Sequence, residues 1–181
     1  MEYHNLLISG LPGSGKSTLI RRLSEIYQIP VISIGDTLRE RWKKEYPNEE
    51  IPFDAYFRSI PETDLVRINL DLKQRVTQGG VIVDTRFPPL VENERSTKLF
   101  VKANLEVRVE RAFVNQKNNL SKNEIKRILF QREQDELKRG KELVSPHYDY
   151  RDIGNYHIQL DTSNLTIEQE IDLIINPDLP F

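Results

Sequence analysis

The sequence contains no cysteine, which excludes disulfide bonds, thiol nucleophiles and thiolate metal sites. Its three histidines, His4, His147 and His157, lie far apart and lack ligand spacing, which argues against a zinc site built from protein groups alone. No apolar run approaches the roughly 20 residues that cross a membrane. The first residues also lack the basic segment and long apolar stretch of a secretory signal. We therefore expect a cytoplasmic protein that does not bind membranes.

A strong charge of either sign is also missing from the 181 residues. Lys and Arg number 26 against 28 Asp and Glu, which gives a formal net charge of −2. That balance argues against a basic surface for nucleic acid. The chain has no internal repeat and no low-complexity linker, so its length predicts one domain over residues 1–181 with a sizeable core. We expect a monomer rather than an oligomer.

Residues 10–17 are Gly-Leu-Pro-Gly-Ser-Gly-Lys-Ser, which fits the phosphate-loop pattern G-x-x-x-x-G-K-[ST]. The glycines let successive N–H groups point at one anion, and the helix expected next adds its positive N-terminal end. Lys16 can reach the β- and γ-phosphates of a nucleotide, and the Ser17 hydroxyl can ligate Mg²⁺. The predicted ATP-binding residues are Gly10, Pro12, Gly13, Ser14, Gly15, Lys16, Ser17 and Thr18.

Apolar runs of strand length alternate with amphipathic stretches along the chain. This alternation predicts an α/β fold with a parallel five-stranded sheet and helices on both faces, the three-layer sandwich of P-loop NTPases. A strand before residues 10–17 and a helix after them favour a phosphate loop over an ordinary glycine-rich turn. Strands are expected at residues 5–8, 31–34, 81–84, 99–102 and 156–160, and helices at 17–27, 37–45, 62–77, 105–115, 122–143 and 167–174. Three prolines between residues 43 and 61 predict an irregular insert there.

Ligands gather at the carboxyl ends of parallel strands, so side chains directly after the strands are candidates for chemistry. Asp84 follows the apolar run 81–83, in the position of an acid that holds Mg²⁺ or accepts a hydrogen bond from Ser17. The alternative is a helix N-cap or turn aspartate. Asp36 fits two roles equally well. It could be an acid in the first turn of its helix, or it could contact the acceptor or the metal.

Two arginines also follow strands, Arg39 after the second and Arg86 after the third. A guanidinium group grips phosphate oxygens in a bidentate fork. We therefore predict that Arg39 and Arg86 hold a second phosphorylated molecule opposite Lys16. The alternative is a surface ion pair, which most arginines form.

The stretch 122–143 interleaves basic and acidic residues, and most of these charges are expected to be solvated and salt-bridged. One or two of its arginines are predicted to close over the transferring phosphoryl group as an electrostatic clamp. The candidates are Arg127, Arg132 and Arg139, of which Arg132 and Arg139 join Lys16 and Arg86 as the predicted catalytic residues. Residues 115–119 are polar and turn-rich, which suits the hinge or tip of a lid.

Taken together, these segments resemble the nucleoside monophosphate kinase superfamily and, within it, the cytidylate kinases. Residues 32–39 are similar to the segment that opens the family's monophosphate-binding region, and Arg39 matches its phosphate-binding arginine. Asp84-Thr85-Arg86 resembles the family's acid-Gly-Arg segment, with Thr85 where glycine is usual. Residues 101–111 resemble the strand and helix that lead to the lid, and residues 131–133, 138–139 and 160–166 resemble the family's C-terminal third.

The resemblance implies reversible phosphoryl transfer from ATP, with Mg²⁺, to a nucleoside monophosphate, and CMP or dCMP is the expected acceptor. It also implies a monophosphate-binding segment over about residues 36–78 and a lid over about residues 115–140. Phe87-Pro88-Pro89 stands after Arg86 where bacterial cytidylate kinases have Asp-Met-Gly-Thr, which leaves the acceptor base open. A kinase for another small acceptor, such as shikimate or dephospho-coenzyme A, and a nucleotide-binding regulatory module are the alternatives.

Overall fold

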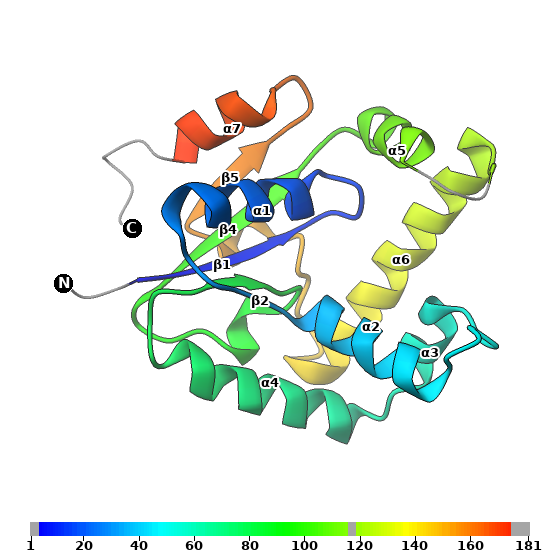
Figure 1. Ribbon diagram of the computed structural model, residues 1–181, viewed down its shortest axis with the longest axis horizontal. Helices are drawn as coiled ribbons and strands as arrows, with labels where there is room; N and C mark the ends of the chain where they lie inside the picture. Colours follow the sequence, from blue (N-terminus) through cyan, green and yellow to red (C-terminus); the bar gives the residue numbers. More distant parts are fainter. Residues whose placement is uncertain (1–3, 116–118, 175–181) are drawn as a thin grey trace.

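Residues 4–115 and 119–174 are described by the structure, a computed structural model, and every structural statement below concerns them. Five strands form one parallel sheet in the order β2-β3-β1-β4-β5 (Figure 1). They are β1 (Asn5–Gly10), β2 (Val31–Ser33), β3 (Ile82–Asp84), β4 (Ser96–Lys102) and β5 (Ile158–Asp161). The predicted α/β architecture with a parallel five-stranded sheet is confirmed.

Helices connect the strands and cover the sheet. They are α1 (Lys16–Tyr27), α2 (Ile34–Glu45), α3 (Phe53–Ser59), α4 (Glu62–Val76), α5 (Leu105–Val114), α6 (Lys122–Leu143) and α7 (Ile167–Ile174). Short 3₁₀ turns lie at Pro88–Leu90 and Ile153–Asn155. The α2 helix begins three residues before the predicted position, because the Ser33 side chain accepts a hydrogen bond from the Asp36 N–H at 3.1 Å and caps the helix there.

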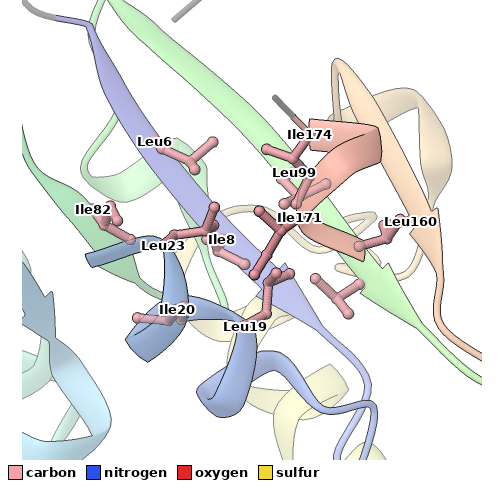
Figure 2. Packing of buried hydrophobic residues seen from close by; sticks show 11 residues of the cluster. Leu6, Ile8, Leu19, Ile20, Leu23, Ile82, Leu99, Leu160, Ile171 and Ile174 are labelled. Carbon is pink, nitrogen blue, oxygen red and sulfur yellow. The ribbon is translucent and has the colours of Figure 1, made fainter. Parts of the chain in front are cut away.

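Successive side chains of β1 point to opposite faces of the sheet, as the period of a strand requires. Leu6 and Ile8 face α1 and α7, and Figure 2 shows them packed among side chains of those helices and of neighbouring strands. Leu7 lies on the other face, against α4. Burying each such side chain contributes about 1.5–3 kcal/mol. The core on the α1 and α7 side consists of Leu6, Ile8, Leu19, Ile20, Leu23, Ile82, Leu99, Val101, Leu160, Ile171 and Ile174.

Aromatic side chains complete the opposite face beside β4. Phe100 of β4 lies 4.8 Å from Tyr156 between ring centroids, and Phe87 lies 6.3 Å from Tyr148. Tyr150 joins the same cluster and is fully buried. The C-terminal half of α6 packs against these rings, which fixes that helix beside the carboxyl end of the sheet.

The predicted irregular insert over residues 43–61 is wrong in its second half, where α3 forms. Pro52 stands at the N-cap of α3 and Pro61 at the N-cap of α4, so each proline precedes a helix rather than interrupting one. Trp42 is buried, and its indole N–H donates to the Ile51 carbonyl at 3.0 Å. The three helices α2, α3 and α4 share an apolar cluster of Leu38, Trp42, Tyr56, Ile60 and Leu65.

The predicted lid region, residues 115–140, includes residues 116–118, which lie outside the described part of the chain. Its remainder is the first part of α6, which starts at a capping box. The Ser121 hydroxyl accepts from the Glu124 N–H, while the Glu124 carboxylate accepts from the Ser121 N–H. Ile125 and Leu129 then pack against Val109 of α5. The start of α6 is therefore packed against α5.

Candidate active site

The loop between β1 and α1 has the backbone geometry of a phosphate cradle. Gly13 and Gly15 adopt φ angles of +80° and +91°, a region that side chains with a Cβ rarely occupy. At Gly10 a Cβ would lie 2.2 Å from the carbonyl oxygen of Val101 on β4, so only glycine lets the two strands approach. The glycines at these three positions are therefore required by geometry.

Backbone N–H groups at the start of α1 lack hydrogen-bond acceptors within the described residues, which fits a site for a phosphate group. No side chain caps this helix. The N–H groups of Gly13, Gly15, Lys16 and Ser17 donate to no backbone acceptor within residues 4–115 and 119–174. The Ser14 hydroxyl is buried and has no partner there either. Anionic oxygens would satisfy these donors and meet the positive end of the helix.

Asp84, at the end of β3, accepts a hydrogen bond from the Lys16 ammonium. Burial and the nearby Arg86 lower the pKa of Lys16, Asp84 opposes both, and the net result is a pKa of about 8. The ammonium is therefore mostly charged at neutral pH. The predicted hydrogen bond from Ser17 to Asp84 is absent from the described residues, because Asp84 pairs with Lys16 instead.

Ser17 and Asp84 both line the cavity at the loop, so they could hold a magnesium ion together. The described residues contain no group of three or more His, Asp or Glu side chains able to bind a metal. Magnesium usually keeps several waters and takes one or two carboxylates together with substrate phosphates. One carboxylate and one hydroxyl beside a phosphate cradle fit that requirement.

Three arginines hold alternate carbonyl oxygens of the loop. Arg86 donates to the Gly10 carbonyl, Arg108 to the Pro12 carbonyl at 3.1 Å, and Arg111 to the Ser14 carbonyl at 3.0 Å. The loop carbonyls therefore face cations, which leaves its N–H groups for an anion. The sequence predicts a role for Arg86 but none for Arg108 and Arg111. Their spacing of three on the helix after β4 was the available signal, because that helix also begins at the carboxyl edge of the sheet.

Each of these arginines is fixed by a second contact. The Glu136 carboxylate accepts from Arg86 Nε at 2.8 Å, and the Glu133 carboxylate accepts from Arg108 Nη1 at 2.6 Å. Both glutamates lie on α6, three residues apart, so one helix face supports both contacts. Arg111 donates at 2.8 Å both to the hydroxyl and to the carbonyl of Thr162, after β5. These contacts fix the loop to α6 and to the end of β5.

Arg39 and Asp36 lie together on α2 at the edge of the same cavity. Arg39 Nη1 donates to Asp36 Oδ1 at 3.0 Å, and the guanidinium lies 5.1 Å from the centroid of the Phe53 ring. Asp36 is in the first turn of its helix. This ion pair is largely exposed, so it contributes little to stability and leaves Arg39 accessible to a ligand.

One cavity of about 950 Å³ joins the loop to the surrounding helices. Lys16, Asp84 and Arg86 lie in its wall, and Arg132 of α6 lines it as well. No ion pair to Arg132 is formed within the described ranges, which leaves its charge for a ligand. Residues of α2, α3 and α4 line the cavity, and so do residues of α5 and α7. The cavity therefore extends between two groups of helices that lie apart in Figure 1.

Arg139 is not in the cavity wall, unlike Arg132. Its Nη2 donates to the carbonyls of Phe57, Arg58 and Ile60 at 3.1, 2.8 and 3.0 Å, at the C-terminal end of α3. Cationic side chains stabilise helix C-termini in this way. The structure thus shows Arg139 joining α6 to α3, and the clamp role proposed from the sequence stays a prediction.

Replacing Arg139 by alanine separates these two roles. We expect a loss of about 2 kcal/mol in unfolding free energy, because charged hydrogen bonds contribute about 1.5–3 kcal/mol. For a protein of this size that corresponds to a fall of about 4–8 °C in melting temperature. Thermal melting and steady-state kinetics are the measurements. A rise in the KM of the acceptor alone supports the joining role.

The matched control for this substitution is Lys138→Ala, because Lys138 is the neighbouring cation and its side chain is 80% exposed. The melting temperature of this control should equal that of the wild-type protein. An unchanged melting temperature for Arg139→Ala, combined with a large fall in kcat, would instead show that Arg139 acts on the phosphoryl group.

Comparison with known proteins gives a family match over most of the chain. The model of the AAA domain family AAA_17 matches residues 9–143. The cytidylate kinase of Methanopyrus kandleri is 31% identical over 181 residues, covering 93% of this chain and 90% of that protein. The cytidylate kinase of Methanospirillum hungatei is 32% identical over 171 residues, covering 91% and 90%.

Solved structures agree with the fold. A protein of Eubacterium ventriosum described as uncharacterized superposes with a TM-score of 0.71 at 15% identity, covering 95% of this chain and 96% of that one. A gluconokinase from Sinorhizobium meliloti superposes with a TM-score of 0.60 at 16% identity, covering 95% and 90%. At these identities the likeness concerns the fold alone. No helix within the described residues is long and apolar enough to span a membrane.

Proposed function

Because the chain belongs to the AAA domain family and to the cytidylate kinase-like nucleoside monophosphate kinases, which are phosphotransferases, we propose that it transfers the γ-phosphoryl group of ATP to CMP or dCMP. The identity of the acceptor is the more specific part of this proposal. It is supported by the names of relatives that are similar over nearly the whole chain.

The observation that carries the proposal is one cavity lined both by the loop around Lys16 and by three arginines from outside the loop. The loop has N–H groups without a backbone acceptor within the described residues. Arg39, Arg86 and Arg132 line the same cavity. A nucleoside triphosphate requires only the first set. The second set fits an acceptor that already carries a phosphate, which favours a nucleoside monophosphate over shikimate or another acceptor without phosphate.

In this reaction an oxygen of the acceptor phosphate attacks the γ-phosphorus in line with the leaving β–γ bridging oxygen. The acceptor phosphate is ionised at neutral pH, so no general base is needed. The chain contributes positioning and charge neutralisation, through the loop N–H groups, Lys16 and the guanidinium groups of Arg86 and Arg132. Magnesium, held by Ser17 and Asp84, would add charge neutralisation on the phosphate oxygens. Closure of helices around the cavity would exclude water from the reacting phosphates.

The side chains invoked in this mechanism line one continuous cavity. We therefore propose that a monomer is competent for catalysis. Size measurement of the active species by light scattering would test this point directly.

The function is tested by incubating the protein with ATP and Mg²⁺ and each nucleoside monophosphate in turn, and measuring diphosphate formation. We expect CMP and dCMP to have the highest kcat/KM. A preference for another monophosphate would change the proposed acceptor base and leave the proposed reaction in place. Transfer only to acceptors without phosphate, or slow ATP hydrolysis with no transfer, would overturn the proposal.

A further inference from the structure

Glu170 on α7 is a buried carboxyl group in the wall of the active-site cavity. The residue is 4% exposed, and its Oε2 has no hydrogen-bond partner within the described part of the chain. The charged group acting on it is Arg111, whose guanidinium is already bound to Ser14 and Thr162. The carboxylate therefore has unused capacity to accept a hydrogen bond.

The position of Glu170 in its helix is one where an apolar residue is expected. Ile167, Glu170, Ile171 and Ile174 are spaced as the buried stripe of an amphipathic helix, and the last two isoleucines pack in the core (Figure 2). A buried carboxylate without a partner costs free energy that an apolar side chain would not. Burial also raises the pKa of Glu170 to about 6, against the effect of Arg111, so the group is mostly ionised at neutral pH. These features suggest that a ligand supplies the missing donor.

The donor nucleoside is the part of the ligand that belongs at this end of the cavity. The β- and γ-phosphates of a bound triphosphate lie at Lys16, and the arginines for the acceptor lie toward α2 and α6. The other end is lined by Thr18 of α1, by Ala112 of α5, by Leu165 before α7 and by Ile167 at the start of α7. Apolar walls with few polar groups are typical of a site for a base.

We propose that Glu170 sets the specificity for the donor base by accepting a hydrogen bond from the exocyclic amino group of adenine. An ionised carboxylate has lone pairs and no proton, so it pairs with an N–H donor. A purine with an oxo group at the same position would present a second lone pair to it and be rejected. The inference rests on the proposed ATP-dependent transfer and adds the group that would select ATP among purine nucleotides.

The test compares ATP with purine riboside triphosphate, which differs only by lacking the 6-amino group, and with ITP, which carries an oxo group there. Binding is measured by calorimetry without acceptor, and transfer is measured with the preferred monophosphate. The wild-type protein should bind ATP about 10- to 100-fold more tightly than either analogue, as a charged hydrogen bond predicts. In Glu170→Leu the three nucleotides should bind with one common affinity, close to that of the purine analogue for the wild-type protein.

Leucine suits the apolar stripe, so this variant should melt at or above the wild-type temperature. Glu168→Gln is the matched control, because Glu168 is exposed on the same helix, and it should keep the wild-type preference. Equal binding of ATP and the purine analogue by the wild-type protein would overturn the proposal. So would an unchanged preference in Glu170→Leu. Selective binding without transfer to any acceptor would refute the proposed function and leave the role of Glu170 in binding supported.

Discussion

Replacing Lys16 by alanine is expected to abolish phosphoryl transfer, with a loss of at least about 1,000-fold in kcat. Removing a single charge-stabilising donor in other active sites already costs about 10²–10³-fold. Lys16 is the only one of the predicted catalytic residues that lies in the loop itself, and its ammonium faces the end of β3. Arg86 is held by the Gly10 carbonyl and Glu136, so it is not expected to take the place of this ammonium. Diphosphate formation at pH 7, below the Lys16 pKa of about 8, is the measurement.

The fold should survive this substitution, although Asp84 loses its partner. The Asp84 side chain is 21% exposed, so water solvates the carboxylate in part when the ammonium is gone. A double variant, Lys16→Ala with Asp84→Asn, removes that residual charge and should melt close to the wild-type protein while remaining inactive. Lys43→Ala, at an exposed position on α2, is the control for loss of a lysine. Near-normal turnover in Lys16→Ala would refute the assignment of the loop as the donor site.

The sequence was sufficient to predict the loop and the sheet because their signals are local. The motif at residues 10–17 is contiguous, and the strands β1 and β3 beside it contain short apolar runs whose carboxyl ends reach the same edge of the sheet. Placing Asp84 at the end of β3 and Arg86 two residues later was therefore enough to bring them to the loop. The structure adds their actual partners, which are Lys16 for Asp84, and Glu136 and the Gly10 carbonyl for Arg86.

The features that could not be predicted from the sequence depend on how the helices pack against one another. The α3 helix has seven residues between prolines, and its burial against α2 and α4 is a tertiary effect that no local pattern reports. Arg139 sits among many charges on α6, and the sequence does not tell which of them meets the end of α3. Arg108 and Glu133 were indistinguishable from solvated charges for the same reason, although the structure pairs a buried Arg108 with a partly buried Glu133.

Replacing Arg86 by alanine should reduce kcat/KM for the acceptor by about 100- to 1,000-fold or more. Its guanidinium joins the Gly10 carbonyl, Glu136 and the side of the cavity where the acceptor phosphate is proposed to bind. The KM for the acceptor should rise more than the KM for ATP, because the loop keeps its N–H donors and Lys16. Arg75→Ala, at an exposed position on α4, should leave both constants unchanged.

The same substitution should also destabilise the protein, and this effect has to be separated from the catalytic one. Glu136 is almost fully buried, with 9% of its side chain exposed, and removing one member of a buried ion pair costs about 3–5 kcal/mol. A double variant, Arg86→Met with Glu136→Leu, replaces the pair by apolar side chains and should recover most of that stability. If phosphate binding is the role of Arg86, this double variant should stay inactive toward monophosphates although its stability is restored. Recovery of transfer together with stability would show that Arg86 only supports the fold, and an acceptor without a phosphate would then fit the cavity better.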